Sequence, residues 1–270
     1  MKNSMISRKL ILIANNGTKS NYLPAVTLDI KHYRDYFKSP EGGAWEDEDI
    51  KFFDNNCTEA SLHDYIHLRT GYIKVWQIVF CGHGYAKENG DSVLELSPDN
   101  DCEVSKIKSW LVGCCSLLIA DSCRKICRNQ NRVFDSVNES IQRRMFSETA
   151  SPAYRAACRN IYLSEAYRPN TTYFAEGYAC SLDECAHDDD QTGGFYSSAL
   201  LHQACKEIES KKRGRRSILS QDKHIVGKFG AVHDHIADVV NKISLQENGE
   251  PQNPHRELGY QWPFYVIPSE

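Results

Sequence analysis

The chain alternates short apolar runs with segments of helical periodicity, and this alternation limits the folds that it can adopt. Each run is rich in Ile, Val, Leu or aromatic residues and ends near Gly, Asp, Asn or Pro, which is typical of a strand buried on both faces. We expect such strands at residues 10–14, 50–53, 75–81, 117–120, 161–163 and 264–267. Apolar spacings of three and four predict helices at 23–37, 58–71, 107–113, 197–208 and 229–243. Together they predict an α/β fold, with a mainly parallel sheet of about six strands between helices on both faces.

The predicted elements fit one compact unit. The chain has 270 residues, enough for one large domain or two small ones, and it shows no internal repeat and no clear linker. Residues 93–96 predict a small hairpin arm after the third strand. Polar stretches near 124–157, 181–194 and 211–224 interrupt the alternation of predicted strands and helices, and we interpret them as insertion loops. We therefore expect a single domain over residues 1–270.

Composition excludes several classes of partner. Hydrophobic residues make up 41% and charged residues 25% of the chain, and the net charge is −4, so no nucleic-acid partner is expected. No run approaches the roughly 18 apolar residues of a membrane span, so no membrane partner is expected either. The apolar run at 10–14 is too short for a signal-peptide core, which predicts a cytoplasmic protein.

The chain holds eleven cysteines without regular spacing, which does not indicate a disulfide framework. In a reducing compartment most of them are expected to be small buried hydrophobes. Cys123 differs in its context. It follows the strand at 117–120, while His83 follows the strand at 75–81 between Gly82 and Gly84.

A thiol and an imidazole at neighbouring strand ends can form a catalytic pair. Functional sites in parallel sheets lie beyond the carboxyl ends of the strands, where Cys123 and His83 would meet. A nearby imidazolium lowers the pKa of a thiol, and the N–H groups of Gly84 and Cys123 could hold an oxyanion. With eleven cysteines and ten histidines in the chain, a chance pairing on adjacent strands is the alternative.

The two strand-end motifs, CGHGY at 81–85 and DSCR at 121–124, resemble those of the caspase–metacaspase clan of cysteine peptidases. The resemblance extends over nearly the whole chain. Residues 10–15 resemble the first strand of that family, 162–166 the fifth strand, which lines the substrate groove, and 194–199 the start of the next helix. Residues 261–263 resemble the Gln-x-Pro that opens the last strand. The resemblance implies a caspase-like fold and an endopeptidase that uses a Cys123–His83 dyad.

The resemblance also implies how a substrate is selected. Animal caspases carry Gln-Ala-Cys at the nucleophile, whereas this chain has Asp121 two residues before Cys123, as in metacaspases. In that branch the Asp lies at the floor of the S1 pocket and selects Arg or Lys at P1. We expect Ser164 beside it on the pocket wall. The alternative is that Asp121 only caps the turn around the nucleophile.

A second pocket acid is harder to place. Many metacaspases have one shortly after the fifth strand, where this chain has Arg168, which would oppose a basic P1 residue. Glu165 or Glu176 would be a substitute, and the sequence does not choose between them.

No cofactor and no metal are expected. The acidic run at 188–190 is similar to calcium-binding acids of some metacaspases, although such a run is more often a solvated loop. Cys180, Cys185 and His187 lack a fourth ligand for zinc.

The expected partners are a protein or peptide substrate and an activating protein. Basic residues within 124–157 and 211–216 are candidate self-cleavage sites, with a solvated basic loop as the alternative. The family resemblance implies a role in stress, cell-death or antiphage responses. Two other functions stay open: an inactive caspase-fold binding module, and a cysteine hydrolase acting on another substrate class.

Overall fold

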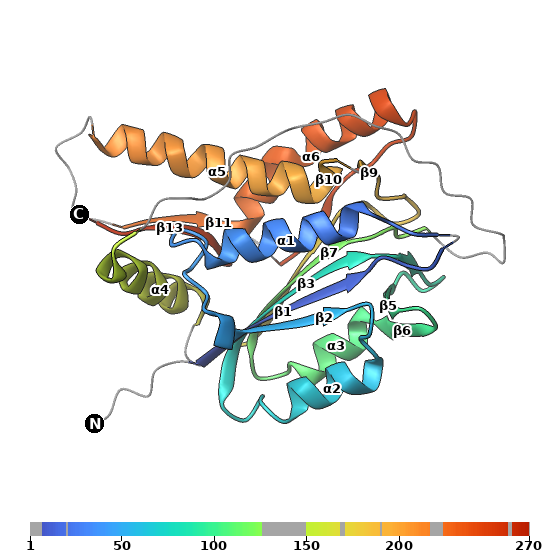
Figure 1. The fold of residues 1–270 in the computed structure, drawn as a ribbon, viewed down its shortest axis with the longest axis horizontal. Helices are drawn as coiled ribbons and strands as arrows, with labels where there is room; N and C mark the ends of the chain where they lie inside the picture. The colour runs from blue at the N-terminus through green and yellow to red at the C-terminus, as the bar shows by residue number, and fades with distance from the viewer. Residues whose placement is uncertain are drawn as a thin grey trace.

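A six-stranded sheet forms the centre of the protein (Figure 1). A computed structural model describes residues 7–19, 21–125, 150–167, 171–189, 191–216, 224–258 and 261–269. The strand order is β12-β8-β7-β3-β1-β2, and β12 alone runs antiparallel to its neighbour. The strands are β1 (Ser7–Asn15), β2 (Ile50–Asp54), β3 (Ile73–Gly82), β7 (Cys115–Asp121), β8 (Tyr173–Tyr178) and β12 (His255–Glu257). The predicted α/β fold with a mainly parallel sheet is confirmed.

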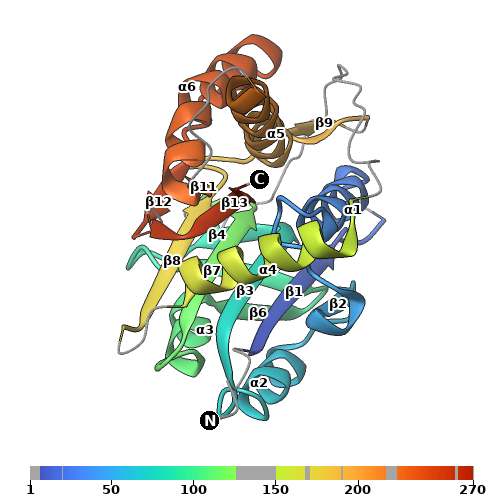
Figure 2. The ribbon, with the colours of Figure 1, turned by 90° about the vertical axis from the view of Figure 1, so that its left-hand side faces the viewer.

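Helices cover both faces of this sheet (Figure 2). One face carries α1 (Ala25–Lys38), α4 (Pro152–Ala166), α5 (Phe195–Arg216) and α6 (Phe229–Glu247). The other face carries α2 (Glu59–His67), α3 (Val104–Trp110) and a small sheet of β4 (Gly84–Ala86), β5 (Ser92–Ser97) and β6 (Asn100–Glu103). Two antiparallel pairs complete the description: β9 (Asp188–Asp189) with β10 (Gly193–Gly194), and β11 (Ile225–Lys228) with β13 (Pro263–Ile267). A short 3₁₀ helix, η1 (Asp47–Asp49), precedes β2.

The strands are apolar on both faces because each face packs against its own core. In β1, Leu10 and Leu12 belong to the core under α1, α4, α5 and α6, whereas Ile11 and Ile13 belong to the core under α2 and α3. Successive side chains of a strand point to opposite faces, so a continuous apolar run is what a doubly covered strand requires. The same alternation holds along β3 and β7, which carry the site.

Four of the six predicted strands lie in the central sheet, as β1, β2, β3 and β7. The run at 264–267 is also a strand, but β13 pairs with β11 outside that sheet, and β12 occupies its edge. The hairpin arm at 93–96 is confirmed as β5. The predicted helices at 23–37, 58–71, 107–113, 197–208 and 229–243 appear as α1, α2, α3, α5 and α6.

The prediction of a strand at 161–163, and of a fifth strand at 162–166, is wrong. These residues end helix α4, which begins after Ser151, whose hydroxyl accepts a hydrogen bond from the Tyr154 N–H, and Pro152 occupies its first turn. Cys158, Tyr162 and Ala166 recur every four residues and are buried, which is helical spacing. The true fifth strand is β8, which the sequence hides because the buried polar residue Glu176 interrupts its apolar run.

The three predicted insertions are partly structured. Of 124–157, residues 126–149 lie outside the described residues, and the segment from Pro152 belongs to α4. The stretch 181–194 holds the β9–β10 hairpin. Of 211–224, residues 211–216 are not a loop, because α5 continues to Arg216, and residues 217–223 lie outside the described residues. Within the described residues, none of the helices combines the length and the apolar character that crossing a membrane requires.

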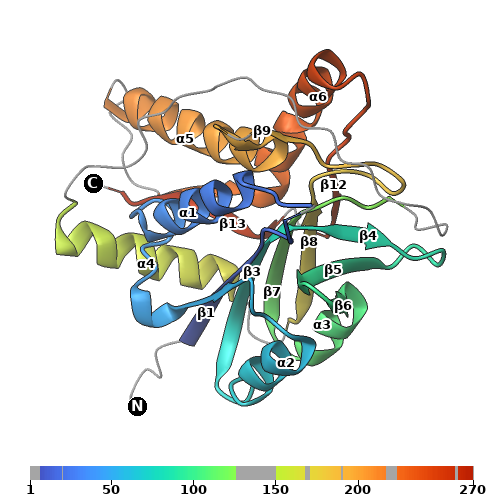
Figure 3. The same ribbon diagram turned by 45° about the vertical axis from the view of Figure 1, so that its right-hand side comes forward.

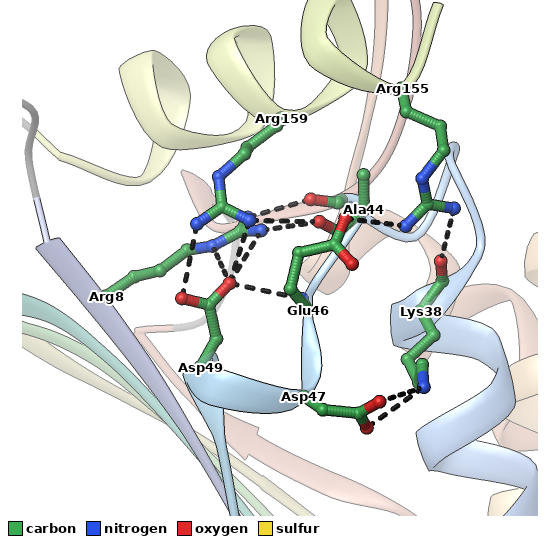
Figure 4. A network of polar contacts seen from close by, with 9 residues as sticks. Arg8, Lys38, Ala44, Glu46, Asp47, Asp49, Arg155 and Arg159 are labelled. Atoms are coloured by element: carbon green, nitrogen blue, oxygen red, sulfur yellow. Dashed lines mark hydrogen bonds and ion pairs between the residues drawn. The ribbon is translucent and has the colours of Figure 1, made fainter. Parts of the chain in front are cut away.

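A buried polar cluster around Asp49 joins α4 to the start of the sheet (Figure 4). Arg8 on β1 is 2% exposed and donates hydrogen bonds to the carbonyl oxygens of Gly43 (2.7 Å) and Ala44 (2.8 Å). Its guanidinium also contacts Asp49 at 3.3 Å. Arg159 on α4 approaches the same carboxylate to 2.9 Å. Burial lowers the pKa of Arg8 to about 10, and Asp49 opposes that shift.

We predict that Arg8→Met destabilises the protein by about 1–3 kcal/mol, because the buried Gly43 carbonyl loses its described donor, and Arg159 alone then serves Asp49 and the Ala44 carbonyl. Urea denaturation measures the loss. Arg34→Met is the matched control, since Arg34 is an exposed arginine that also pairs with an aspartate, Asp47. An exposed pair contributes at most about 1 kcal/mol. Equal losses in the two variants would contradict the role given to Arg8.

Candidate active site

Strands β3 and β7 lie side by side in the sheet (Figure 3). Their pairing places His83 and Cys123, which follow them, at one edge of the sheet. The two strands are parallel neighbours, and their last paired residues are Cys81 and Asp121. His83 and Cys123 each follow two residues later. Neighbouring strands lie about 4.8 Å apart, so the register brings the two chain positions side by side.

The glycines around His83 are required by close backbone contacts. Gly82 has a φ of +153°, and a Cβ there would lie 2.6 Å from the carbonyl oxygen of Asn15. A Cβ on Gly84 would lie 2.8 Å from the Ser122 hydroxyl oxygen. Gly84 therefore packs directly against the residue that precedes Cys123. This packing brings the backbone segments of the two predicted oxyanion residues, Gly84 and Cys123, into proximity.

His83 lies in a narrow, buried position. It is 3% exposed, and its Nε2 lies 2.6 Å from the carbonyl oxygen of Asn21. Gly17 packs against the same nitrogen, since a Cβ on Gly17 would lie 2.6 Å from His83 Nε2. The imidazole is thus held between the β1–α1 connection and the end of β3.

The Cys123 thiol contacts the segment after β8. Its Sγ lies 3.6 Å from the carbonyl oxygen of Ala186, and it forms a side-chain hydrogen bond with Cys185. This hydrogen bond and the burial of the thiol raise the pKa of Cys123 well above the ordinary value. The thiol is therefore protonated at neutral pH in this arrangement, and a protonated thiol is a weak nucleophile.

Asp121 lies beside a second buried acid that the sequence did not reveal. Its Oδ2 accepts hydrogen bonds from the N–H (3.1 Å) and the hydroxyl (2.5 Å) of Ser197. Asp29 on α1 accepts both its described hydrogen bonds from the Gly194 N–H, at 3.1 and 2.9 Å. A Cβ on Gly194 would lie 2.4 Å from Asp121 and 3.2 Å from Asp29, so Gly194 sits between the two carboxylates.

Burial raises the pKa of both acids, and the charge of Asp121 adds to the shift of Asp29. Burial, and then the charge of Asp121, raise the pKa of Asp29 well above its ordinary value. Burial raises the pKa of Asp121 to about 6, against the hydrogen bonds from Ser197. None of the contacts described for either carboxylate is with a cationic side chain. Asp29 could have been suspected from the sequence, because it is a charged residue among Val26, Ile30 and Tyr33 on the apolar side of α1.

The remaining predicted pocket residues lie elsewhere. Ser164 and Glu165 are on helix α4, where Ser164 donates to the Ile161 carbonyl and Glu165 pairs with Lys228. Glu176 on β8 pairs with Lys108 at 2.8 Å. Since 162–166 is not a groove strand, the basis for placing Ser164 and Glu165 in the pocket is lost. Arg168 lies outside the described residues.

The residues considered as calcium or zinc ligands show no metal-binding cluster among those that the structure describes. Within the parts of the chain that the structure describes, no three His, Cys, Asp or Glu side chains are grouped to hold a metal ion. Asp188 and Asp189 form strand β9, and Asp190 is not among the described residues.

We predict that the deprotonation of Asp121 lowers the free energy of unfolding as the pH rises. A carboxyl whose pKa is higher in the folded state binds its proton more tightly there. The unfolding free energy therefore falls between the unfolded pKa near 4 and the folded pKa of about 6. Asp121→Asn removes this dependence. In urea titrations, wild type should lose stability relative to Asp121→Asn from pH 4 to pH 6, and parallel curves would contradict the prediction.

The fold is shared with a caspase, although sequence comparison finds no relative. No protein-family model matches the chain, and no curated protein matches it significantly. Among solved structures, caspase-1 from Spodoptera frugiperda superposes with a TM-score of 0.57 over 96% of this chain and 88% of that chain. The sequence identity is 10%, so this similarity shows the fold alone. The protein has a caspase-like α/β fold with His83 and Cys123 at the carboxyl edge of its sheet.

Proposed function

We propose that the protein is a cysteine endopeptidase with Cys123 as nucleophile and His83 as general base. The observation that carries this proposal is the β3–β7 register, which delivers both residues to one sheet edge in a caspase-like fold. A thiol, a neighbouring imidazole and backbone amides at one edge are the groups that acyl transfer needs.

The reaction would proceed through an acyl-enzyme. His83 accepts the proton of Cys123, and the thiolate attacks the scissile carbonyl carbon. The N–H groups of Gly84 and Cys123 donate to the oxyanion that forms. His83 then protonates the leaving amine, and a water molecule that it activates releases the acyl group.

The site must rearrange before this chemistry begins. The Cys123 thiol contacts Cys185 and the Ala186 carbonyl, and His83 Nε2 contacts the Asn21 carbonyl. Release of Cys123 from Cys185 removes the hydrogen bond that raises the thiol's pKa. An activating protein partner that shifts the segment around Cys185 would supply this step.

We propose that the enzyme prefers Arg or Lys at P1, and that Asp121 and Asp29 together bind the positive charge of that side chain. Two buried carboxylates that repel each other, with no cation among their described contacts, form a site that a guanidinium would stabilise. Gly194 lies between them, so a P1 side chain would have to displace its N–H from Asp29. We do not extend the proposal to Ser164 and Glu165.

A second candidate function is a caspase-fold binding module without catalysis. The contacts of Cys123 and His83 with backbone carbonyls, and the raised pKa of the thiol, favour it. A Cys-directed covalent peptide inhibitor separates the two functions, because an active nucleophile is labelled and a buried, protonated thiol is not. Self-cleavage, a cytoplasmic location and a role in stress, cell-death or antiphage responses stay predictions.

A fluorogenic peptide panel varied at P1 tests the peptidase. We expect cleavage after Arg or Lys, lost in Cys123→Ala and in His83→Ala. Cleavage after Asp, or after apolar residues only, would contradict the role of the two acids, and activity that survives Cys123→Ala would contradict the nucleophile.

Pocket substitutions test the specificity separately. Asp121→Asn and Asp29→Asn should each lower kcat/KM for an Arg substrate by about 10- to 100-fold, because a charge-assisted hydrogen bond contributes about 1.5–3 kcal/mol. Asp47→Asn, which removes an exposed carboxylate at η1, is the control and should leave kcat/KM unchanged.

A further inference from the structure

Three cysteines lie together at the edge of the sheet where the nucleophile is proposed. Cys123 follows β7, and Cys180 and Cys185 lie in the segment after β8. Cys180 is fully buried, with its thiol directed to the carbonyls of Ser122 (3.5 Å) and Glu184 (3.4 Å). As whole residues, Cys123 and Cys185 are both partly exposed, although the Cys123 thiol itself is largely buried, and each thiol has the other as a partner.

The backbone sets Cys123 and Cys185 opposite each other. The N–H of Arg124 donates to the Glu184 carbonyl at 2.9 Å, and the N–H of Asp183 donates to the Arg124 carbonyl at 3.0 Å. These two bonds join Arg124 to two consecutive residues, Asp183 and Glu184, of a segment that runs in the opposite direction. Cys123 directly precedes Arg124, and Cys185 directly follows Glu184, so the two cysteines lie opposite each other. The contact of Cys123 Sγ with the Ala186 carbonyl is the next one along the same two segments.

This arrangement suits a disulfide. Residues opposite each other in antiparallel segments have Cα atoms about 4.5–5.5 Å apart. Disulfides join cysteines whose Cα atoms are about 4.4–6.8 Å apart, so the backbone would need little movement.

The two thiols also differ in reactivity. The hydrogen bond from Cys123, helped by the charge of Lys125, lowers the pKa of Cys185 to about 7, while burial, Glu250 and Asp183 act against this shift. Cys185 is therefore partly a thiolate at neutral pH, and a thiolate in an accessible position reacts with peroxides. Burial raises the pKa of Cys180, which keeps that thiol protonated.

We propose that Cys123 and Cys185 form a reversible disulfide in the presence of hydrogen peroxide, which blocks the nucleophile until a dithiol reduces it. The blocking of catalysis rests on the proposed function of Cys123, whereas the formation of the bond does not.

The chemistry balances with peroxide as the oxidant. Cys185 attacks one oxygen of hydrogen peroxide, the O–O bond breaks, and a sulfenic acid and one water result. The Cys123 sulfur then attacks the sulfenic sulfur, the S–S bond forms, and the S–O bond breaks. The hydroxyl of the sulfenic acid takes up the proton of the Cys123 thiol and leaves as a second water. A dithiol reverses the step by thiol–disulfide exchange and is itself oxidised to a disulfide.

Mass spectrometry of the whole chain tests the bond directly. The protein is treated with about one equivalent of hydrogen peroxide, its remaining thiols are alkylated, and its peptides are mapped without reduction. We expect one cross-linked peptide pair containing Cys123 and Cys185, lost after dithiothreitol. A Cys123 sulfinic acid beside an alkylated Cys185, or a bond from Cys123 to Cys180 or Cys127, would overturn the proposal.

Activity on the panel's cleaved peptide gives the second readout, with each variant compared with its own untreated sample. The wild-type protein should lose peptidase activity in peroxide, and dithiothreitol should then raise that residual activity at least tenfold. Cys185→Ser should lose activity without regaining it, because its Cys123 oxidises further. Cys205→Ser, which alters a half-buried cysteine on α5, should behave as wild type. If no variant cleaves peptides, the mapping still decides whether the bond forms.

Discussion

The parallel pairing of β3 with β7 is the constraint on which the candidate site depends. Both strands are buried between two cores, with alternate side chains committed to opposite faces. A slip of one residue would exchange the two faces of a strand, so packing holds the register that aligns Cys81 with Asp121. The positions of His83 and Cys123 follow from that register. The packing of the two cores therefore fixes the relative positions of the two candidate catalytic residues.

The sequence predicted the parts of the fold that depend on apolar periodicity. The apolar runs of β1 and β7 are uninterrupted, and that of β3 has a single polar residue, Gln77, within a longer run. The order of these strands along the chain was enough to predict that His83 and Cys123 meet at one edge. The errors occurred where polar residues are buried. Glu176 interrupts β8 and hid it, and the apolar residues that end α4 imitated a strand in its place. Tertiary contacts that no local pattern contains, such as the ion pair of Arg159 with Asp49, help to hold α4 in place.

The residues around the proposed nucleophile were predictable only in part. Asp121 could be identified because it is adjacent to Cys123 in the sequence, but its partner Asp29 lies 92 residues earlier, on a different element. Cys185 was considered only as a metal ligand, because its pairing with Cys123 depends on backbone hydrogen bonds between segments that are distant in sequence. Buried charges divide here into two kinds. Arg8 is matched by Asp49 and by carbonyls, which is a structural arrangement, whereas none of the contacts described for Asp29 and Asp121 is with a cation. Unmatched buried charge is a common property of functional sites.

The hydrogen bonds of the two acids have a consequence for helix α5. Gly194 directly precedes this 22-residue helix, and Ser197 lies in its first turn. Their amides have no carbonyl partner within the helix and donate to the two acids instead. Asp29 and Asp121 therefore act as the helix's N-terminal cap. A cationic side chain that binds the acids competes with those amides for the same oxygen lone pairs. Ligand affinity and the order of the first turn of α5 are thus thermodynamically linked, and a substitution that loosens this turn would strengthen binding of the cation.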